Sequence, residues 1–156
     1  MSRSNAPIAA ALLPKTSRAM LVDALQRPVV ASQFPAHAVT LVLSVRLLAG
    51  SIAAKRDPLV DLSQRLNSFT AARAVLDFSQ ACSRAWPENA MVSRPCCHAL
   101  TPDETVFAQM AEAARGGDRQ AFAAVLDGLV RRERHERLYE ITSHAVAELS
   151  AADPTI

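Results

Sequence analysis

The sequence predicts an all-α protein: a single-domain antiparallel bundle of five to six helices around a central apolar helix at about residues 36–54. Three observations lead to this fold class. Alanine, which has the highest helix propensity, occupies 30 of the 156 positions. Glycines number only 4 and aromatic residues make up only 4% of the chain, a composition that disfavours β-sheets. Half of the residues are hydrophobic, which suffices for a folded core and excludes bulk disorder.

The length predicts one domain, and the prolines mark where its helices end. We expect a flexible N-terminal arm over residues 1–15, a helical domain over residues 16–150 and a C-terminal tail over residues 151–156. A first helix is predicted from Ser17 to Gln26, because Pro28 disfavours helical backbone in the residue before it.

The central stretch at residues 36–54 is almost entirely apolar, and a helix of this length is just long enough to span a bilayer. Its polar residues fall on one narrow stripe of the helix surface: His37, Thr40, Ser44 and Ser51. Arg46 lies in the middle, opposite the stripe, and an arginine at a bilayer centre costs at least about 2.5–3.5 kcal/mol. The sequence therefore predicts a buried helix of a soluble protein, with no membrane partner.

A third helix is predicted from Pro58 to the Trp86-Pro87 pair. Asp57 is a suitable N-cap, and proline is favoured at the first helical position. Apolar side chains recur at helical spacing along the whole segment, on two strips: Leu59, Leu62, Leu66, Phe69 and Leu76, and Val60, Val75, Phe78 and Cys82.

The loop at residues 87–101 is followed by clear helix boundaries. Thr101 and Glu104 form a capping-box pattern that begins the next helix. Gly116-Gly117 ends that helix, and Asp118 caps the following one. The residues from 119 to 149 are compatible with one helix or with two.

The segment Arg115-Gly-Gly-Asp-Arg-Gln-Ala-Phe-Ala-Ala-Val-Leu resembles the start of the core helical region of extracytoplasmic-function sigma factors, in which a Gly-Asp-x-x-Ala-Phe turn joins two helices. The resemblance covers residues 115–126 and implies a helical hairpin there. The aromatic-rich stretch that melts promoters in those proteins is missing from this sequence. Asp118 as a helix cap and Phe122 as a core anchor account for the same residues, so we assign no family.

The run Arg131–Arg137 holds four arginines and two glutamates. The interleaved glutamates weaken the local positive field, and no aromatic residues accompany the run to stack on bases. The net charge of the chain is only +2. We therefore interpret the run as an intrahelical ion-pair surface and expect no nucleic-acid partner.

The segment Ser93–His98 contains the residues most suggestive of chemistry, Cys96, Cys97 and His98. Thiolates and imidazoles bind metals, and Cys82 offers a third sulfur, so a thiol- or metal-responsive regulator is the alternative function. The spacing lacks a Cys-x-x-Cys pair, and we commit to no metal and no cofactor. The simpler interpretation makes the cysteines small buried apolar residues that tie the loop to the core.

His37 and Arg46 are the polar candidates for the core of the bundle. His37 fits a hydrogen-bonded structural histidine better than a catalytic imidazole, because no set of catalytic partners is visible. A buried Arg46 must be paired, for example with Asp77, Glu104 or an acid across a dimer interface. The alternative is a guanidinium that reaches solvent while its aliphatic stem is buried.

Charge is distributed unevenly, with a net +6 over residues 1–56 and a net −4 over residues 99–156. Opposite-signed ends attract one another within a monomer or between two copies. The sequence contains no glycine-rich phosphate loop and no nucleophile or metalloprotease motif. An odd number of cysteines favours a reducing compartment. We expect a non-catalytic cytoplasmic protein that works through protein–protein contacts as a homodimer; a small enzyme around His37 and Arg46 is a third possibility.

Overall fold

The computed structural model describes residues 27–152. Within that range the chain forms six α-helices, two short 3-10 helices and no β-strand, so the all-α fold class is confirmed. The predicted arm at residues 1–15, the predicted helix Ser17–Gln26 and residues 153–156 of the predicted tail lie outside the described residues.

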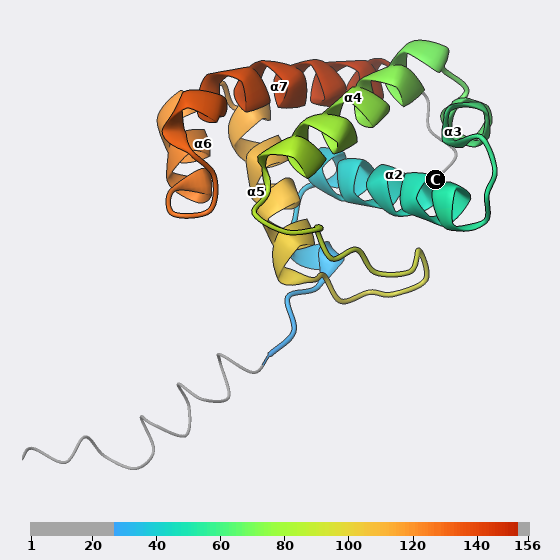
Figure 1. Cartoon of the computed structure of the whole chain (residues 1–156), viewed down its shortest axis with the longest axis horizontal. Helices are drawn as coiled ribbons and strands as arrows, with labels where there is room; N and C mark the ends of the chain where they lie inside the picture. The colour runs from blue at the N-terminus through green and yellow to red at the C-terminus, as the bar shows by residue number, and fades with distance from the viewer. Residues whose placement is uncertain (1–26, 153–156) are drawn as a thin grey trace, which may run out of the picture.

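The elements follow one another along the chain in the order shown in Figure 1. They are η1 (Ala31–Gln33), α2 (Ala36–Ala53), α3 (Pro58–Leu66), α4 (Phe69–Ala85), α5 (Pro102–Arg115), α6 (Arg119–Leu126), η2 (Arg132–Arg134) and α7 (His135–Ala151). The helix at the centre of the prediction is therefore present, and it ends one residue earlier than expected.

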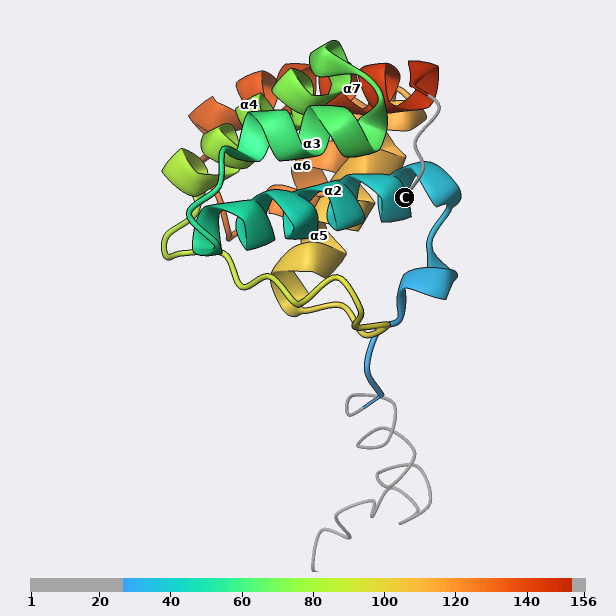
Figure 2. The same ribbon diagram turned by 90° about the vertical axis from the view of Figure 1, so that its right-hand side faces the viewer.

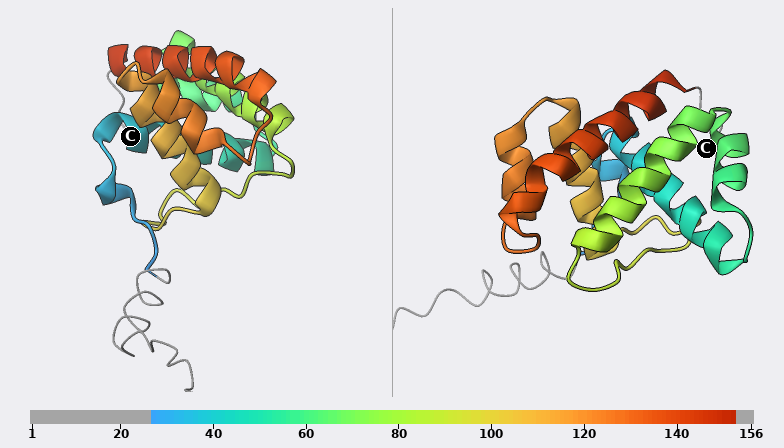
Figure 3. Two further views of the ribbon diagram at one scale, coloured as in Figure 1. Left: turned by 90° about the vertical axis from the view of Figure 1, so that its left-hand side faces the viewer. Right: turned by 45° about the horizontal axis from the view of Figure 1, so that its top comes forward.

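Helix α2 contacts four other helices, α3, α4, α5 and α7. Helix α4 runs antiparallel to α2 and to α7, and α4 and α7 lie side by side (Figures 1 and 3). Helix α5 crosses this antiparallel set and contacts α2, α6 and α7. The buried apolar side chains of all these helices belong to one core cluster.

Helix α2 is long and apolar enough to cross a membrane by length and composition, and 44% of it is buried within the structure, where it packs against α3, α4, α5 and α7. Its polar residues are accommodated locally. The hydroxyls of Ser44 and Ser51 are buried and donate to the carbonyls of Thr40 and Leu47, one turn earlier. Arg46 is ion-paired with Glu104 in the protein interior, so its charge is compensated there.

The single helix predicted from Pro58 to Trp86 is wrong, because the structure divides it into α3 and α4. Asn67 ends α3 in the left-handed conformation with φ of 49°, a backbone state that asparagine tolerates. Ser68 then caps α4 by accepting a hydrogen bond from the backbone N–H of Ala71. The break turns Phe69 outward, where 63% of its surface is exposed, although its spacing predicts a core residue.

The predicted boundaries of α5 and α6 are confirmed. Thr101 and Glu104 form both hydrogen bonds of a capping box at the start of α5. Gly117, with φ of 70°, lies in the turn that follows α5, and Asp118 caps α6 through the N–H of Ala121. The hairpin implied at residues 115–126 is therefore present.

The predicted intrahelical ion-pair surface at residues 131–137 is wrong. Gly128, with φ of 78°, and the short 3-10 helix η2 separate α6 from α7, so the run is not one helix. Its recorded ion pairs reach other segments: Arg119 to Glu136, and Arg132 to Asp127. The chain from residue 119 onward thus forms two α-helices.

Candidate functional site

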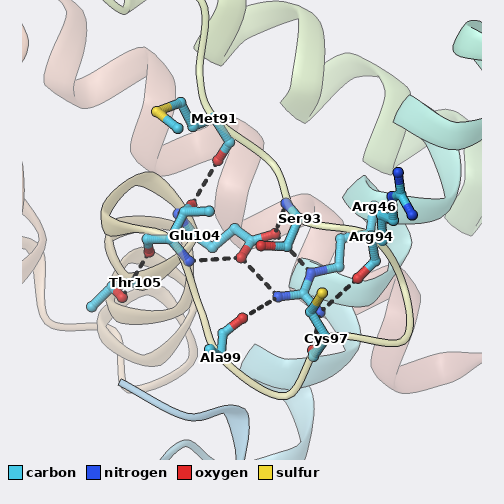
Figure 4. A network of polar contacts seen from close by, with 9 residues as sticks. Arg46, Met91, Ser93, Arg94, Cys97, Ala99, Glu104 and Thr105 are labelled. Carbon is cyan, nitrogen blue, oxygen red and sulfur yellow. Dashed lines mark hydrogen bonds and ion pairs between the residues drawn. The ribbon is translucent and has the colours of Figure 1, made fainter. Parts of the chain in front are cut away.

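The buried arginine of α2 forms the most extensive polar network in the described part of the chain (Figure 4). The guanidinium of Arg46 is 1% exposed. Its Nε donates to Oε1 of Glu104 at 2.7 Å, and its Nη2 donates to Oε2 of Glu104 at 2.8 Å. The remaining donors reach three backbone carbonyls of the loop at residues 87–101: Ala99 at 2.9 Å, Cys97 at 2.5 Å and Arg94 at 3.3 Å. All five N–H donors of the guanidinium are therefore used.

The carboxylate of Glu104 is equally saturated and is fully buried. Besides the two bonds from Arg46, Oε1 accepts from the backbone N–H of Ser93 at 2.9 Å. Its Oε2 accepts from the backbone N–H of Thr101, also at 2.9 Å. A carboxylate has about four lone-pair sites, and Glu104 fills four.

Both groups of the pair are charged in the folded protein. The hydrogen bond to Glu104 raises the pKa of Arg46 against the opposite effect of burial. Burial raises the pKa of Glu104, but the hydrogen bonds from Arg46, Thr101 and Ser93 outweigh it, so the pKa lies below its usual value. The resulting contribution to stability is fully present above the unfolded-state pKa of the carboxyl. It is lost as the pH falls through the lower folded-state value.

The network attaches the loop at residues 87–101 to α2 and α5. Asp103 extends it, because its carboxylate accepts from the indole N–H of Trp86 and from the backbone N–H of Met91. Figure 2 shows the loop running below α2 from the end of α4 to the start of α5. With every donor of Arg46 and every acceptor of Glu104 engaged within the chain, this arrangement holds a loop in place.

The same loop also holds the start of the described chain. An isolated antiparallel bridge joins Val30 to Ala99. The backbone N–H of Leu100 donates to the carbonyl of Val29 at 2.7 Å, and that of Ala31 donates to the carbonyl of His98 at 3.0 Å. The segment before α2 is therefore positioned by the loop that Arg46 binds.

The structure resolves which acid pairs with Arg46. The partner is Glu104, whereas Asp77 pairs with Arg73 on the exposed side of α4. Arg46 belongs to the net-positive residues 1–56 and Glu104 to the net-negative residues 99–156, so these two parts of the sequence meet in the ion pair. The sequence did not indicate the roles of Asp103 and of the loop carbonyls. A backbone carbonyl can accept a hydrogen bond whatever side chain its residue carries.

The cysteines are distributed over two environments. Cys82 is buried in α4, and burial raises the pKa of its thiol. Cys96 and Cys97 are exposed, contrary to the expectation that the loop cysteines are buried. All three thiols are free. Among residues 27–152, no three His, Cys, Asp or Glu side chains lie together as a metal site, and His98 is exposed. The thiol- or metal-responsive regulator stays a prediction.

The different burial of the thiols predicts two classes of reactivity. In the native protein we expect Cys96 and Cys97 to react with a thiol reagent at least about 100-fold faster than Cys82, because a buried thiol with a raised pKa offers little thiolate. A time course of labelling read by intact mass measures the difference. The C82S variant serves as the control, since it should lose only the slow phase. Equal labelling rates for the three thiols would contradict the described burial.

His37 lies at the start of α2, nine residues before Arg46 on the same helix. Its Nε2 is buried, and none of residues 27–152 provides a hydrogen-bond partner for it, contrary to the expectation of a hydrogen-bonded structural histidine. Burial lowers the pKa of His37, the positive charge of Arg115 lowers it further, and Glu112 acts in the opposite direction. His37 therefore faces the C-terminal end of α5, whereas Arg46 binds its N-terminal end. The structure does not bring the two candidates together.

An apolar groove of about 430 Å³ lies between α2, α4 and the loop that follows α4. Its walls are formed by residues from four segments: Val45, Leu48, Ala49, Ile52 and Ala53; Phe78, Ser79, Cys82 and Ser83; Asn89, Ala90 and Val92; and Phe107. Ile52, which lines the groove, is 55% exposed. Met91, which lies in the chain between the lining residues Ala90 and Val92, is 67% exposed. We refer to this feature as the apolar groove.

Comparison with known protein families, characterised proteins and solved structures finds no match for this chain.

Proposed function

We propose that this chain is a non-catalytic cytoplasmic protein that acts through protein–protein contacts, and that its partner is a second copy of itself. The observation that carries the proposal is the apolar groove with its exposed neighbours Ile52 and Met91. Large apolar side chains beside a hollow are typical of surfaces that become buried on association.

We infer that the apolar groove and its exposed neighbours form the self-complementary face that a two-fold dimer requires. In such a dimer the same surface of each copy faces the other, so one face must carry both the projection and the hollow that receives it. Ile52 lines the apolar groove, and Met91 lies between two residues that line it, Ala90 and Val92. The projecting side chains of one copy can therefore enter the groove of the other, which removes apolar area from water on both sides.

The charges beside the groove support the same pairing. Lys55 follows the end of α2, and Glu88 follows the end of α4. Helices α2 and α4 run antiparallel, so these two helix ends point in opposite directions (Figure 1). We infer that they flank the apolar groove at its two ends. A two-fold axis through the face reverses the direction of the groove in the partner, so the Lys55 end of one copy meets the Glu88 end of the other.

The remaining parts of the proposal rest on separate observations. The Arg46–Glu104 network has its hydrogen-bonding capacity filled within the chain, which supports a structural role for the polar core. Three free cysteines, two of them exposed, are compatible with a reducing compartment such as the cytoplasm.

The oligomeric state tests the proposal. We expect sedimentation equilibrium of the full chain to show a dimer at about 10–100 µM, in the range of weak to moderate self-association. The I52D/M91D variant is expected to be monomeric, because each change places a carboxylate in an apolar contact. The control is F69D, which alters an equally exposed apolar residue that does not line the groove. It should remain dimeric.

Charge reversal tests the two-fold arrangement. K55E should weaken the dimer several-fold because it places two carboxylates opposite each other, and K55E/E88K should restore the affinity. A monomeric wild-type protein at these concentrations, or a dimer that survives I52D/M91D, would refute the self-association proposal.

A further inference from the structure

A second hollow lies between the C-terminal end of α4 and the N-terminal end of α7, and it differs in character from the apolar groove. It is a cleft of about 500 Å³. Its floor is apolar and is formed by Ala81, Ala85 and Leu138; its charged residues are Arg84, Glu133, Arg134 and Arg137. We call it the arginine cleft. Figure 3 (right) shows these two helices next to each other, with the end of α4 close to the start of α7.

The three arginines of the cleft are not neutralised. None of them forms an ion pair with an acidic side chain in the described part of the chain. Two acids close to the cleft in sequence pair with other arginines, Glu136 with Arg119 and Asp127 with Arg132. With Glu133 as the one acid that lines it, the cleft carries a surplus of about two positive charges.

One of the arginines is held in position by the fold. A guanidinium nitrogen of Arg134 donates to the backbone carbonyl of Arg84, close to the end of α4. Arg134 thereby joins the end of α4 to the start of α7, and its other N–H groups remain available to a ligand. Helix α7 begins at His135 without a side-chain cap, so the partial positive charge of its N-terminus adds to the field of the arginines.

We propose that the arginine cleft binds a small phosphate monoester that carries an apolar organic group. Guanidinium groups match the oxygens of a phosphate through paired, charge-assisted hydrogen bonds. A phosphate monoester dianion carries the two negative charges that balance this surplus, whereas a single carboxylate carries only one. The cleft has the size of small-molecule sites, roughly 300–1,000 Å³, and exceeds what an inorganic phosphate fills. The apolar floor accounts for the rest of the ligand.

Phenyl phosphate is the probe for this site, titrated into the full-length protein and followed by NMR chemical shifts. We expect saturable binding that shifts the amide signals of Arg84, Arg134 and Arg137 and that weakens several-fold when NaCl is raised from about 50 to about 300 mM. R137Q should weaken binding about tenfold or more, because it removes one charge-assisted contact. The control is R65Q, an exposed arginine of α3 that does not line the cleft; it should bind like the wild type.

Three further ligands separate the possible outcomes. Inorganic phosphate should bind at least several-fold more weakly than phenyl phosphate, and benzyl alcohol should not bind measurably. Equal affinities for inorganic and phenyl phosphate would overturn the assignment of an organic group. Binding of phenyl phosphate that is unchanged in R137Q would overturn the site itself. A short single-stranded oligonucleotide that binds through Arg137 while phenyl phosphate does not would overturn the small-molecule assignment in favour of nucleic acid.

Discussion

Replacement of Arg46 by methionine is expected to lower the free energy of unfolding by about 3–5 kcal/mol, because removing one partner of a buried pair leaves an uncompensated charge. The variant leaves the carboxylate of Glu104 in the core without its two strongest hydrogen bonds. It also removes the donors to three loop carbonyls. Urea unfolding followed by circular dichroism measures the loss.

The matched control is R73M, which breaks the exposed ion pair between Arg73 and Asp77. It should cost at most about 1 kcal/mol, as is usual for surface pairs. The R46M/E104M double variant should lose less stability than the sum of the losses of R46M and E104M, because the two residues share one network. A loss for R46M no larger than that for R73M would contradict a structural role of the network.

The F107A variant is expected to lose about 3–5 kcal/mol, the range typical of buried aromatic residues replaced by alanine. Phe107 is 2% exposed and packs against Phe78 at a ring-centroid distance of 5.5 Å and against Trp86 at 5.3 Å. Its removal opens a cavity beneath the apolar groove, between α4 and α5. Thermal and urea unfolding measure the change.

The corresponding control is F69A, which removes the same side chain from an exposed position at the start of α4. It should change the stability by no more than about 0.5 kcal/mol. Equal losses for F107A and F69A would mean that the outward orientation of Phe69 is incorrect.

Features that depend on local chemistry could be predicted from the sequence. Alanine content and the apolar stretch of α2 identified an all-α bundle and its central helix. The capping box of Thr101 and Glu104 and the cap of Asp118 fixed the starts of α5 and α6 within a residue, because a cap satisfies backbone groups a few positions away.

Features that depend on distant residues could not be predicted. The apolar pattern continues past Asn67, so hydrophobic spacing alone does not divide α3 from α4. The break is made by Asn67 in the left-handed conformation and by the cap of Ser68, which the continuous apolar pattern conceals. Glu104 was one of several acids available to Arg46, and only tertiary packing selects among them. The arginine cleft exists because the ends of α4 and α7 meet, which no local pattern of charges reveals.

The partners of Arg46 stand 48 to 58 positions away along the chain. The network is complete only when α2, α5 and the loop at residues 87–101 are all in place, so we expect the helices to associate first and the network to form after the rate-limiting step of folding. Interactions made after that step retard unfolding without accelerating folding. The network thus contributes to how long a folded molecule persists, and the bundle contacts determine how quickly it forms.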